Sequence, residues 1–412
     1  MQRRLHFLLI FQNIFISLRV SVAALWPWRS LRKMIRASFA EIGATVVWAY
    51  GGFHPGPICL FFAMESRKEI MRVGIIGTGA IARKHAEAYQ RIGYEIAACT
   101  NRSRTAGIEF AKATGAEFVA ASEQLCHHPR VDFVDVCTLP DYRLQAVESC
   151  AEAKKHILVQ KPMATSLATA ARMIEVANAA GIQLGVVSQH RFDDSILFLN
   201  DALAGDRLGR ILQADAYVKW YRPPEYYARP GKGTWDVEGG GALITQAIHQ
   251  VDLLLQLAGA VKEVFAYWQK GALHSIQSED VISVVLRYAS GATGVIQAST
   301  AFWPGSAERL EFHGTKGTAV VTGDRLTTWN VREDTGDPPP LAGEGASGAS
   351  DPMAISTLPF ERQFLDFGEA CRTGRPPRVS WRHGWRAMQL VSAIYQSAGE
   401  GKPVAIDHSL PA

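Results

Sequence analysis

From Met71 onward, short apolar segments alternate with amphipathic ones, and this alternation is the strongest structural signal in the chain. The apolar segments have the length of strands and the segments between them have helical spacing, which is typical of successive βαβ units. The expected strands cover residues 72–77, 94–100, 131–138, 156–160 and 182–188. We therefore expect a doubly wound parallel sheet, an α/β Rossmann domain, over residues 71–190.

Beyond residue 190 the pattern changes to strands joined by short glycine turns. The expected strands cover residues 211–221, 264–271, 280–288, 292–300, 309–314 and 318–323, and the expected helices cover 195–204, 241–258, 360–372 and 384–398. Such a succession predicts a large, mainly antiparallel sheet with one open face. Residues 191–412 are therefore expected to form an α+β domain, with a surface loop at 333–356 and final helices that could pack back on the Rossmann domain.

Residues 1–70 show no clean helical or strand period, and we expect no folded unit there. The charged start and the apolar run over 5–18 resemble a signal peptide, although polar residues interrupt that run and it is too short to span a membrane. Met64 and Met71 both precede a complete first strand. A translation start placed too far upstream is therefore favoured, with export or a genuine extension as alternatives.

The charge distribution separates the two parts of the chain. Residues 1–70 hold nine Lys/Arg against three Asp/Glu, and residues 71–412 hold 34 against 36. A nearly neutral main body lacks the basic field that binding to nucleic acid requires. The six cysteines are scattered without metal-ligand spacing, which predicts reduced thiols in a cytoplasmic protein and no metal site.

A glycine-rich turn follows the first strand and opens a helix, which is the context of a dinucleotide-binding motif. Its first glycine permits the tight turn, its second lets the backbone approach a pyrophosphate, and the helix N-terminus offers N–H groups to the phosphates. The cofactor-binding residues expected in this turn are Gly77, Thr78, Gly79, Ala80 and Ile81.

The residues after the second strand bear on the choice between NAD and NADP. An acidic residue there would hold the ribose 2′-hydroxyl of NAD, but no carboxylate occurs before Glu109. Asn101 and Arg102 are expected to face the cofactor, and the guanidinium groups of Arg102 and Arg104 could meet a 2′-phosphate. This pattern favours NADP over NAD.

Two further segments carry candidate chemistry. Lys161 follows the expected strand at 156–160, at the sheet edge where ligands bind in such folds, and a partly desolvated lysine beside a cationic nicotinamide could exchange a proton with a substrate hydroxyl. Three glycines start the helix at 241–258. On that helix Thr245 and His249 are four residues apart, and Asp252 follows His249 by three, so a polar stripe interrupts its apolar side.

Taken together, these features resemble the Gfo/Idh/MocA family of NAD(P)-dependent dehydrogenases over roughly residues 71–408. The resemblance rests on the GTGAIA turn, the run HILVQKPMA at 156–164, the GGGAL and HQVD segments of one helix, and the ending GRPPRVS to GKPV. It implies that Lys161 is the proton relay and that His249 touches the reacting hydroxyl. It also implies that Gln160 and Pro162 lie near the nicotinamide, with a cis bond between Lys161 and Pro162.

Two positions depart from the family pattern: Gln160 stands for glutamate and Thr245 for aspartate. A threonine cannot serve as a carboxylate base, so the relay would rest on Lys161 and His249. Both replacements remove negative charge, which favours an acidic or uncharged substrate. The expected substrate-binding residues are Arg191, Trp235, Thr245 and Asp252, although the Tyr- and Arg-rich segment 221–235 could equally be an ordered loop over the sheet edge.

The expected function is reversible hydride transfer between NADP(H) or NAD(H) and a secondary alcohol or ketone of a sugar, polyol, cyclitol or related cyclic diol. The alternative is a non-catalytic dinucleotide-binding sensor of the same fold, which the changes at Gln160 and Thr245 would permit. We expect a small carbohydrate-like substrate and neither nucleic acid nor a membrane as partner. The resemblance and the open sheet face predict a homodimer or homotetramer.

Overall fold

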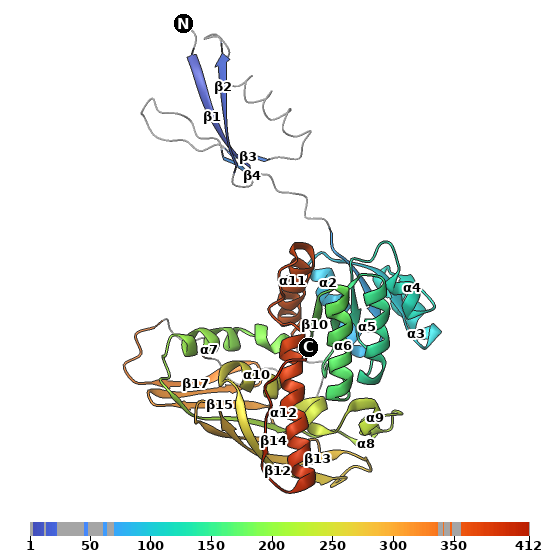
Figure 1. Cartoon of the computed structure of the whole chain (residues 1–412), viewed down its shortest axis with the longest axis vertical. Helices are drawn as coiled ribbons and strands as arrows, with labels where there is room; N and C mark the ends of the chain where they lie inside the picture. The colour runs from blue at the N-terminus through green and yellow to red at the C-terminus, as the bar shows by residue number, and fades with distance from the viewer. Residues whose placement is uncertain are drawn as a thin grey trace. The chain divides into compact units, whose positions relative to one another are not determined.

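The computed structural model describes residues 3–11, 14–22, 45–47, 61–63, 70–336, 341, 347 and 356–411 (Figure 1). Residues 1–70 and 71–412 form two separate compact units. In the first unit, β1 (Arg3–Phe11) pairs antiparallel with β2 (Ile14–Val22), and β3 (Thr45–Val47) with β4 (Phe61–Ala63). These strands occur where the sequence predicts no folded unit. Met64, one of the two candidate translation starts, lies outside the described residues.

The first half of the second unit is a six-stranded parallel sheet with the order β10-β9-β8-β5-β6-β7. Its strands are β5 (Arg72–Ile76), β6 (Glu95–Thr100), β7 (Glu117–Phe118), β8 (Phe133–Val136), β9 (His156–Val159) and β10 (Leu184–Val186). The strand order reverses between β5 and β8, because the chain runs outward from β5 through β6 to β7 and outward from β8 through β9 to β10. This is the arrangement of a doubly wound sheet. The predicted Rossmann fold is confirmed, and β7 is a strand that the sequence pattern did not reveal.

Helices cover both faces of this sheet, as its nearly continuous apolar strands require. They are α2 (Ala80–Arg91), α3 (Arg104–Thr114), α4 (Ser122–Cys126), α5 (Arg143–Glu152) and α6 (Leu167–Ala180). On one face α2 and α3 share a core with α11 (Leu358–Thr373), where Phe364 stacks on Tyr89 with ring centroids 4.2 Å apart. On the other face α5 and α6 pack together.

The second half is an eight-stranded sheet with the order β17-β16-β15-β11-β14-β13-β12-β18, antiparallel except where β11 pairs with β14. Its strands are β11 (Ile211–Lys219), β12 (Val261–Lys270), β13 (Glu279–Tyr288), β14 (Thr293–Ser299), β15 (Arg309–Gly314), β16 (Gly317–Thr322), β17 (Arg325–Val331) and β18 (Val404–Ala405). The expected mainly antiparallel sheet is therefore confirmed, with β17 and β18 as additional strands.

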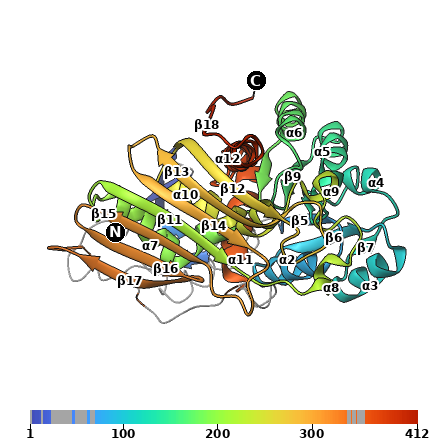
Figure 2. The ribbon, with the colours of Figure 1, turned by 90° about the horizontal axis from the view of Figure 1, so that it is seen from below.

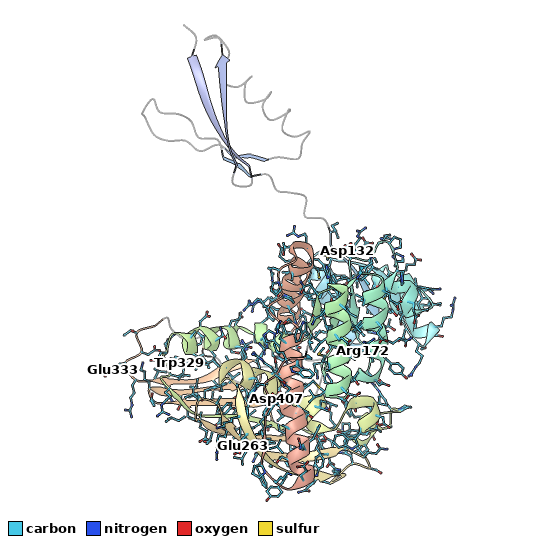
Figure 3. All side chains as sticks on the ribbon, viewed as in Figure 1. Asp132, Arg172, Glu263, Trp329, Glu333 and Asp407 are labelled. Carbon is cyan, nitrogen blue, oxygen red and sulfur yellow. The ribbon has the colours of Figure 1, made fainter. Side chains whose placement is uncertain are left out.

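The two faces of the large sheet differ. α7 (Asp194–Ala204) and α10 (Ile248–Leu257) lie behind the sheet in Figure 2, which views it from the opposite, outer side. Trp329 of β17 packs against Phe198 of α7, with ring centroids 5.1 Å apart. On the outer face, Glu263 of β12 forms an ion pair with Arg287 of β13 at 3.6 Å. Figure 3 shows Trp329 and Glu263 among the other side chains.

One helix connects the two halves. α12 (Trp381–Glu400) packs against β12 and α10 of the second half and against α6 and β10 of the first (Figure 1). Its capping box at Ser380 and His383 and its left-handed C-terminal Gly401 define both ends. Among the helices that the structure describes, none is long and apolar enough to cross a membrane.

Candidate active site

A cleft of about 420 Å³ lies at the carboxyl ends of β5, β8 and β9. These strands meet where the sheet order reverses, which is the usual ligand position in doubly wound folds. Its Rossmann side is formed by Gly79, Ala80, Ile81, Cys137, Thr138, Leu139, Pro140, Arg143, Gln160, Lys161 and Pro162. Its other side comes mainly from the segment between Trp220 and Glu238 and from the helix that carries Thr245 and His249.

The glycine-rich turn has the geometry that a dinucleotide requires. The Gly77 N–H donates to the Thr100 carbonyl at 2.9 Å, and its φ of +89° favours glycine. A Cβ on Gly79 would meet nothing within 4 Å, so this position is open toward the cleft. No side chain caps the N-terminus of α2, and the buried Thr78 hydroxyl has no partner among the described residues. These features fit a bound pyrophosphate.

The loop after β6 contributes an amide and a guanidinium group. Asn101 Oδ1 accepts from the Thr78 N–H at 3.4 Å, and its Nδ2 donates to the Ser103 carbonyl at 3.1 Å, so Asn101 links this loop to the glycine turn. Arg102 is exposed. It donates to the Tyr142 hydroxyl at 2.6 Å and lies over the Tyr142 ring, 5.3 Å from its centroid.

Lys161 projects from the end of β9 into the cleft. The Lys161–Pro162 bond is cis, as the resemblance implied. The ammonium group donates to the Thr245 backbone carbonyl at 2.8 Å, across 84 residues of sequence. Burial, and then the positive charges of Lys232, Arg143 and Arg222, lower the pKa of Lys161 to about 7. This lysine can therefore take up or release a proton near neutral pH.

The glycine-opened helix begins as a π-helical turn, Leu243–Ala247, and continues as α10. π-turns are frequent at functional sites because they change the backbone hydrogen-bonding register. The Thr245 hydroxyl donates to the Gly241 carbonyl at 2.7 Å. His249 packs edge-on against His190 with ring centroids 4.8 Å apart. Burial, followed by the charges of Lys161 and His190, holds the pKa of His249 well below its usual value, so His249 is neutral.

A carboxylate from β13 caps the start of this helix. Glu279 accepts from the N–H groups of Gly241 at 2.9 Å and Leu243 at 2.8 Å, and from the Tyr395 hydroxyl of α12 at 2.9 Å. Burial raises the pKa of Glu279 to about 7 even though these hydrogen bonds act to lower it. The helix that carries Thr245 is thus anchored to both the large sheet and α12.

Buried polar groups support the strand ends below Lys161. Gln160 Oε1 accepts from the Lys161 N–H at 3.1 Å, so its Nε2 faces His85 Nε2 at 2.8 Å. His85 then carries its proton on Nδ1, which lies 2.6 Å from Asp135 Oδ2. Arg143 donates to the carbonyls of Gln160, Pro162 and Thr138. Arg143 therefore fixes the backbone on both sides of Lys161.

Three of the expected substrate-binding residues do not line the cleft. Arg191 and Asp252 form an ion pair, with nitrogen–oxygen distances of 2.6 and 2.7 Å, and this pair occupies both charged groups. Trp235 packs against Trp268 and Tyr395, and its Nε1 faces the Gln277 carbonyl. Thr245, the fourth, does line the cleft.

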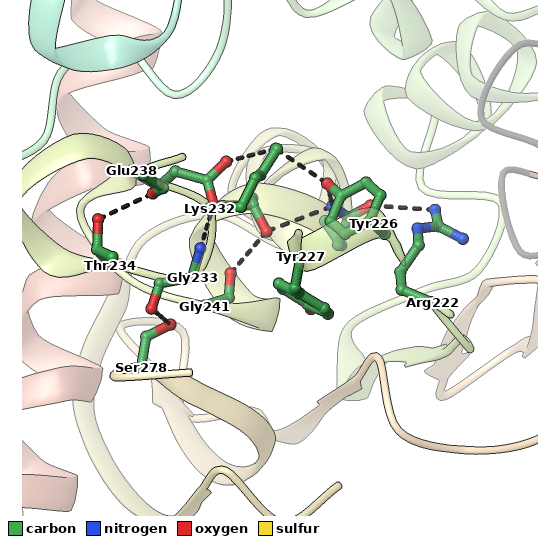
Figure 4. A network of polar contacts seen from close by, with 12 residues as sticks. Arg222, Tyr226, Tyr227, Lys232, Gly233, Thr234, Glu238, Gly241 and Ser278 are labelled. Atoms are coloured by element: carbon green, nitrogen blue, oxygen red, sulfur yellow. Dashed lines mark hydrogen bonds and ion pairs between the residues drawn. The ribbon is translucent and has the colours of Figure 1, made fainter. Parts of the chain in front are cut away.

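Several cleft residues were not identified from the sequence as site residues. Among them are Lys232, Glu238, Gln246 and Glu308, which line the cleft together with Arg222 and Tyr226. Figure 4 shows Arg222, Tyr226, Lys232 and Glu238. The Tyr- and Arg-rich segment has no helical or strand period that would have predicted which of its side chains point inward. Glu238 is the most informative of these residues. Thr245 replaces the family's aspartate, but Glu238 supplies a buried carboxylate at another position of the cleft.

Comparison with known proteins agrees with this architecture. Residues 71–188 match the family model described as "Oxidoreductase family, NAD-binding Rossmann fold", and residues 196–320 match the GFO/IDH/MocA C-terminal domain. Myo-inositol 2-dehydrogenase of Thermotoga maritima is 30% identical over 82% of this chain and 99% of its own length. D-apiose dehydrogenase of Paraburkholderia graminis is 31% identical over 81% and 88%.

Solved structures also resemble this chain. The WlbA dehydrogenase of Chromobacterium violaceum, in complex with NADH and UDP-GlcNAcA, superposes with a TM-score of 0.74 at 27% identity, covering 84% of this chain and 98% of that one. The Bordetella pertussis WlbA dehydrogenase, also with NADH and UDP-GlcNAcA, gives 0.73 at 28% identity, covering 82% and 99%. The chain therefore belongs to the GFO/IDH/MocA family of NAD-binding oxidoreductases.

Proposed function

We propose that this protein is a cytoplasmic NAD(P)-dependent dehydrogenase that oxidises a secondary alcohol of a sugar, polyol, cyclitol or related cyclic diol, or reduces the corresponding ketone. The observation that carries the proposal is the position of Lys161. It lies in the cleft that the glycine-rich turn also borders, and its pKa of about 7 suits proton exchange with a substrate oxygen.

Each side chain has a defined part in this proposal. A bound NAD(P) would supply the nicotinamide that accepts or donates the hydride. Lys161 takes the hydroxyl proton as the alcohol is oxidised and returns it in the reverse reaction. Neutral His249 orients the same hydroxyl by a hydrogen bond, and Thr245 offers its oxygen to the substrate. Arg191 and Asp252, as an ion pair beside His249, hold the helix rather than the substrate.

The cofactor turn is assigned in the same way. Gly77 and Gly79 would let the pyrophosphate approach, with Thr78, Ala80 and Ile81 as the other residues of the turn that would bind it. Gln160 and Pro162 would border the nicotinamide. Because Arg102 is a guanidinium group that could meet a 2′-phosphate and its loop has no carboxylate, we propose NADP rather than NAD as the preferred cofactor.

The charge of the cleft bears on the substrate. Its lining contains five arginine and lysine residues against two carboxylates, Glu238 and Glu308. The basic residues are Arg143, Lys161, Arg222, Arg229 and Lys232. This balance favours a substrate that carries a carboxylate or another acidic group, and the WlbA dehydrogenases were crystallised with UDP-GlcNAcA. The non-catalytic sensor is not favoured, because the named relatives are dehydrogenases and reductases.

A binding and turnover experiment tests the proposal. NADPH and NADH are titrated into the full chain by calorimetry, and a panel of polyols, sugars and sugar acids is then assayed with wild type, Lys161→Ala and Lys262→Ala. Lys262 is an exposed residue of β12 outside the cleft and serves as the matched control. We expect nucleotide binding by all three proteins and loss of turnover only in Lys161→Ala. Nucleotide binding without turnover of any compound by wild type would contradict the proposal.

We also propose that the protein is a homodimer or homotetramer that associates through the outer face of the large sheet. Phe265, Val285 and Val295 are in register across three adjacent strands on that face. Val285 is 56% exposed and the neighbouring Tyr267 is 69% exposed. No helix among the described residues covers this apolar row, and such exposed rows commonly mark interfaces.

A further inference from the structure

A connected set of polar side chains forms the wall of the cleft opposite the Rossmann strands (Figure 4). Lys232 lies between Glu238 and Tyr226: its Nζ is 2.5 Å from Glu238 Oε1 and 3.1 Å from the Tyr226 hydroxyl. The other carboxylate oxygen of Glu238 accepts from the Gly233 N–H at 2.8 Å. The Glu238 side chain is 5% exposed and that of Lys232 is 16% exposed, so the ion pair is mostly buried and restricts the position of Lys232.

The hydrogen-bond partners fix the orientation of the Tyr226 phenol. Arg222 can only donate, and its Nη2 lies 3.1 Å from Gln246, so the atom facing Arg222 must be the amide oxygen. The amide nitrogen of Gln246 therefore faces Tyr226, and it donates to the phenol oxygen at 2.9 Å. Lys232 also can only donate. The Tyr226 oxygen thus accepts two hydrogen bonds, which uses both of its lone pairs.

The remaining group of this phenol is its O–H proton. Among the described residues no acceptor for it is present, although Tyr226 is only partly exposed and lines the cleft together with Lys161. A phenol that accepts two hydrogen bonds is a better donor, because hydrogen bonds in a chain polarise one another. Lys232 and Arg222 also lie over the Tyr226 ring, 4.7 and 5.7 Å from its centroid, which further restricts its motion.

We propose that Tyr226 is a substrate-contacting residue whose phenolic O–H donates a hydrogen bond to an oxygen atom of the bound substrate, with Lys232 and Gln246 as its positioning residues. This inference rests on the proposed dehydrogenase function and names a further determinant of its specificity. The contact selects compounds with an acceptor oxygen at that place, such as a hydroxyl, carbonyl or carboxylate oxygen. It provides a neutral donor on the helix side of the cleft, where Thr245 has no carboxylate to offer.

The neighbouring tyrosine is a matched control. The Tyr227 hydroxyl contacts the Thr300 hydroxyl at 2.7 Å, and Tyr227 does not line the cleft. Tyr226→Phe and Tyr227→Phe each remove one phenolic oxygen from adjacent positions of α8 (Pro224–Tyr227), so they differ mainly in where that oxygen points. Melting curves of both variants show whether either change affects folding.

The test compares wild type, Tyr226→Phe and Tyr227→Phe on the best substrate of the panel and on its monodeoxy analogues. We expect Tyr226→Phe to lower kcat/KM about 10- to 100-fold, with the dinucleotide Kd and Tm unchanged, and Tyr227→Phe to keep wild-type kcat/KM. With wild type, kcat/KM for one deoxy analogue should be lower than that for the parent substrate by a similar factor. With Tyr226→Phe, that analogue and the parent substrate should have the same kcat/KM, because the donor and its acceptor form one contact.

The outcomes separate this inference from the proposed function. If wild type turns over a substrate, Lys161→Ala does not, and Tyr226→Phe equals wild type, the inference is overturned and the dehydrogenase function stands. The inference would also be overturned if, for every deoxy analogue, the loss of kcat/KM caused by Tyr226→Phe simply added to the loss caused by removing the substrate hydroxyl. Absence of turnover by wild type on every compound would overturn both.

Discussion

Lys161 and Lys232 line the same cleft but hold their protons differently. Burial and the nearby positive charges lower the pKa of Lys161 to about 7. Burial also acts to lower the pKa of Lys232, but Tyr226 and Glu238 outweigh it and raise the pKa of this residue. Lys232 is therefore a fixed positive charge, whereas Lys161 titrates near neutral pH and is suited to relay a proton.

This difference predicts a pH profile. Alcohol oxidation requires neutral Lys161, so kcat/KM for oxidation should rise as the pH passes about 7 and then level off, whereas ketone reduction requires the protonated form and should fall over the same range. In Lys232→Met the oxidation midpoint should move to higher pH, because the lost positive charge had lowered the pKa of Lys161. A midpoint that stays in place would contradict this coupling, and steady-state rates at constant ionic strength measure it.

At the residue scale, sequence motifs identified the groups that belong to one continuous segment. Lys161, Thr245 and His249 follow recognisable strand-end and helix patterns, and all three line the cleft. The Arg191–Asp252 ion pair joins residues 61 positions apart. The sequence therefore could not show that these two charged groups pair with each other rather than with a substrate. Lys232 lies in a turn, and Glu238 ends α9 (Trp235–Glu238), a four-residue helix too short for a period to indicate which side chains point inward.

At the scale of elements, two helices begin with glycines that serve different purposes. A Cβ on Gly79, before α2, would meet no protein atom within 4 Å, and its φ of −73° is open to any residue. A Cβ on Gly241, before the π-turn, would lie 1.8 Å from the Glu279 carbonyl oxygen. The first glycine leaves room for a ligand, and the second lets a helix end pack on a strand.

The two glycines make a paired prediction. Gly79→Ala should leave Tm unchanged and raise the dinucleotide Kd at least about tenfold, because the methyl group would face the pyrophosphate. Gly241→Ala should lower the free energy of unfolding by about 1–3 kcal/mol or more, because the backbone must shift. Calorimetric titration and denaturant unfolding measure the two effects. Equal nucleotide affinity in Gly79→Ala would contradict the assignment of the turn.

Element prediction from the sequence succeeded where burial alternates or is continuous. The strands from β8 to β10 are almost fully buried, and β13 alternates from Asp280 onward, so their patterns were clear. β7 has only two residues. β17 buries Leu326 alone and lies at the sheet edge, so its burial leaves no period. Both depend on neighbouring strands rather than on a pattern of their own.

At the scale of the whole molecule, the outer face of the large sheet predicts self-association. Sedimentation velocity should show a dimer or tetramer for wild type and smaller species for Val285→Glu, since a carboxylate placed in an apolar interface is costly. Leu365→Glu is the control, because Leu365 is a comparably exposed apolar residue on α11. Identical sedimentation of wild type and Val285→Glu would show that this face is not the interface.

The position of α12 restricts how a ligand reaches the cleft. Because one 20-residue helix packs against β10 and α6 as well as β12 and α10, a hinge rotation that separated the two halves would have to break packing along much of its length. Such an opening would expose a large apolar area to water, whereas the segment from Pro223 to Glu238 borders the cleft and belongs to neither sheet. Exchange of substrate and product is therefore expected to depend on rearrangement of this segment, with the two halves remaining a single rigid block.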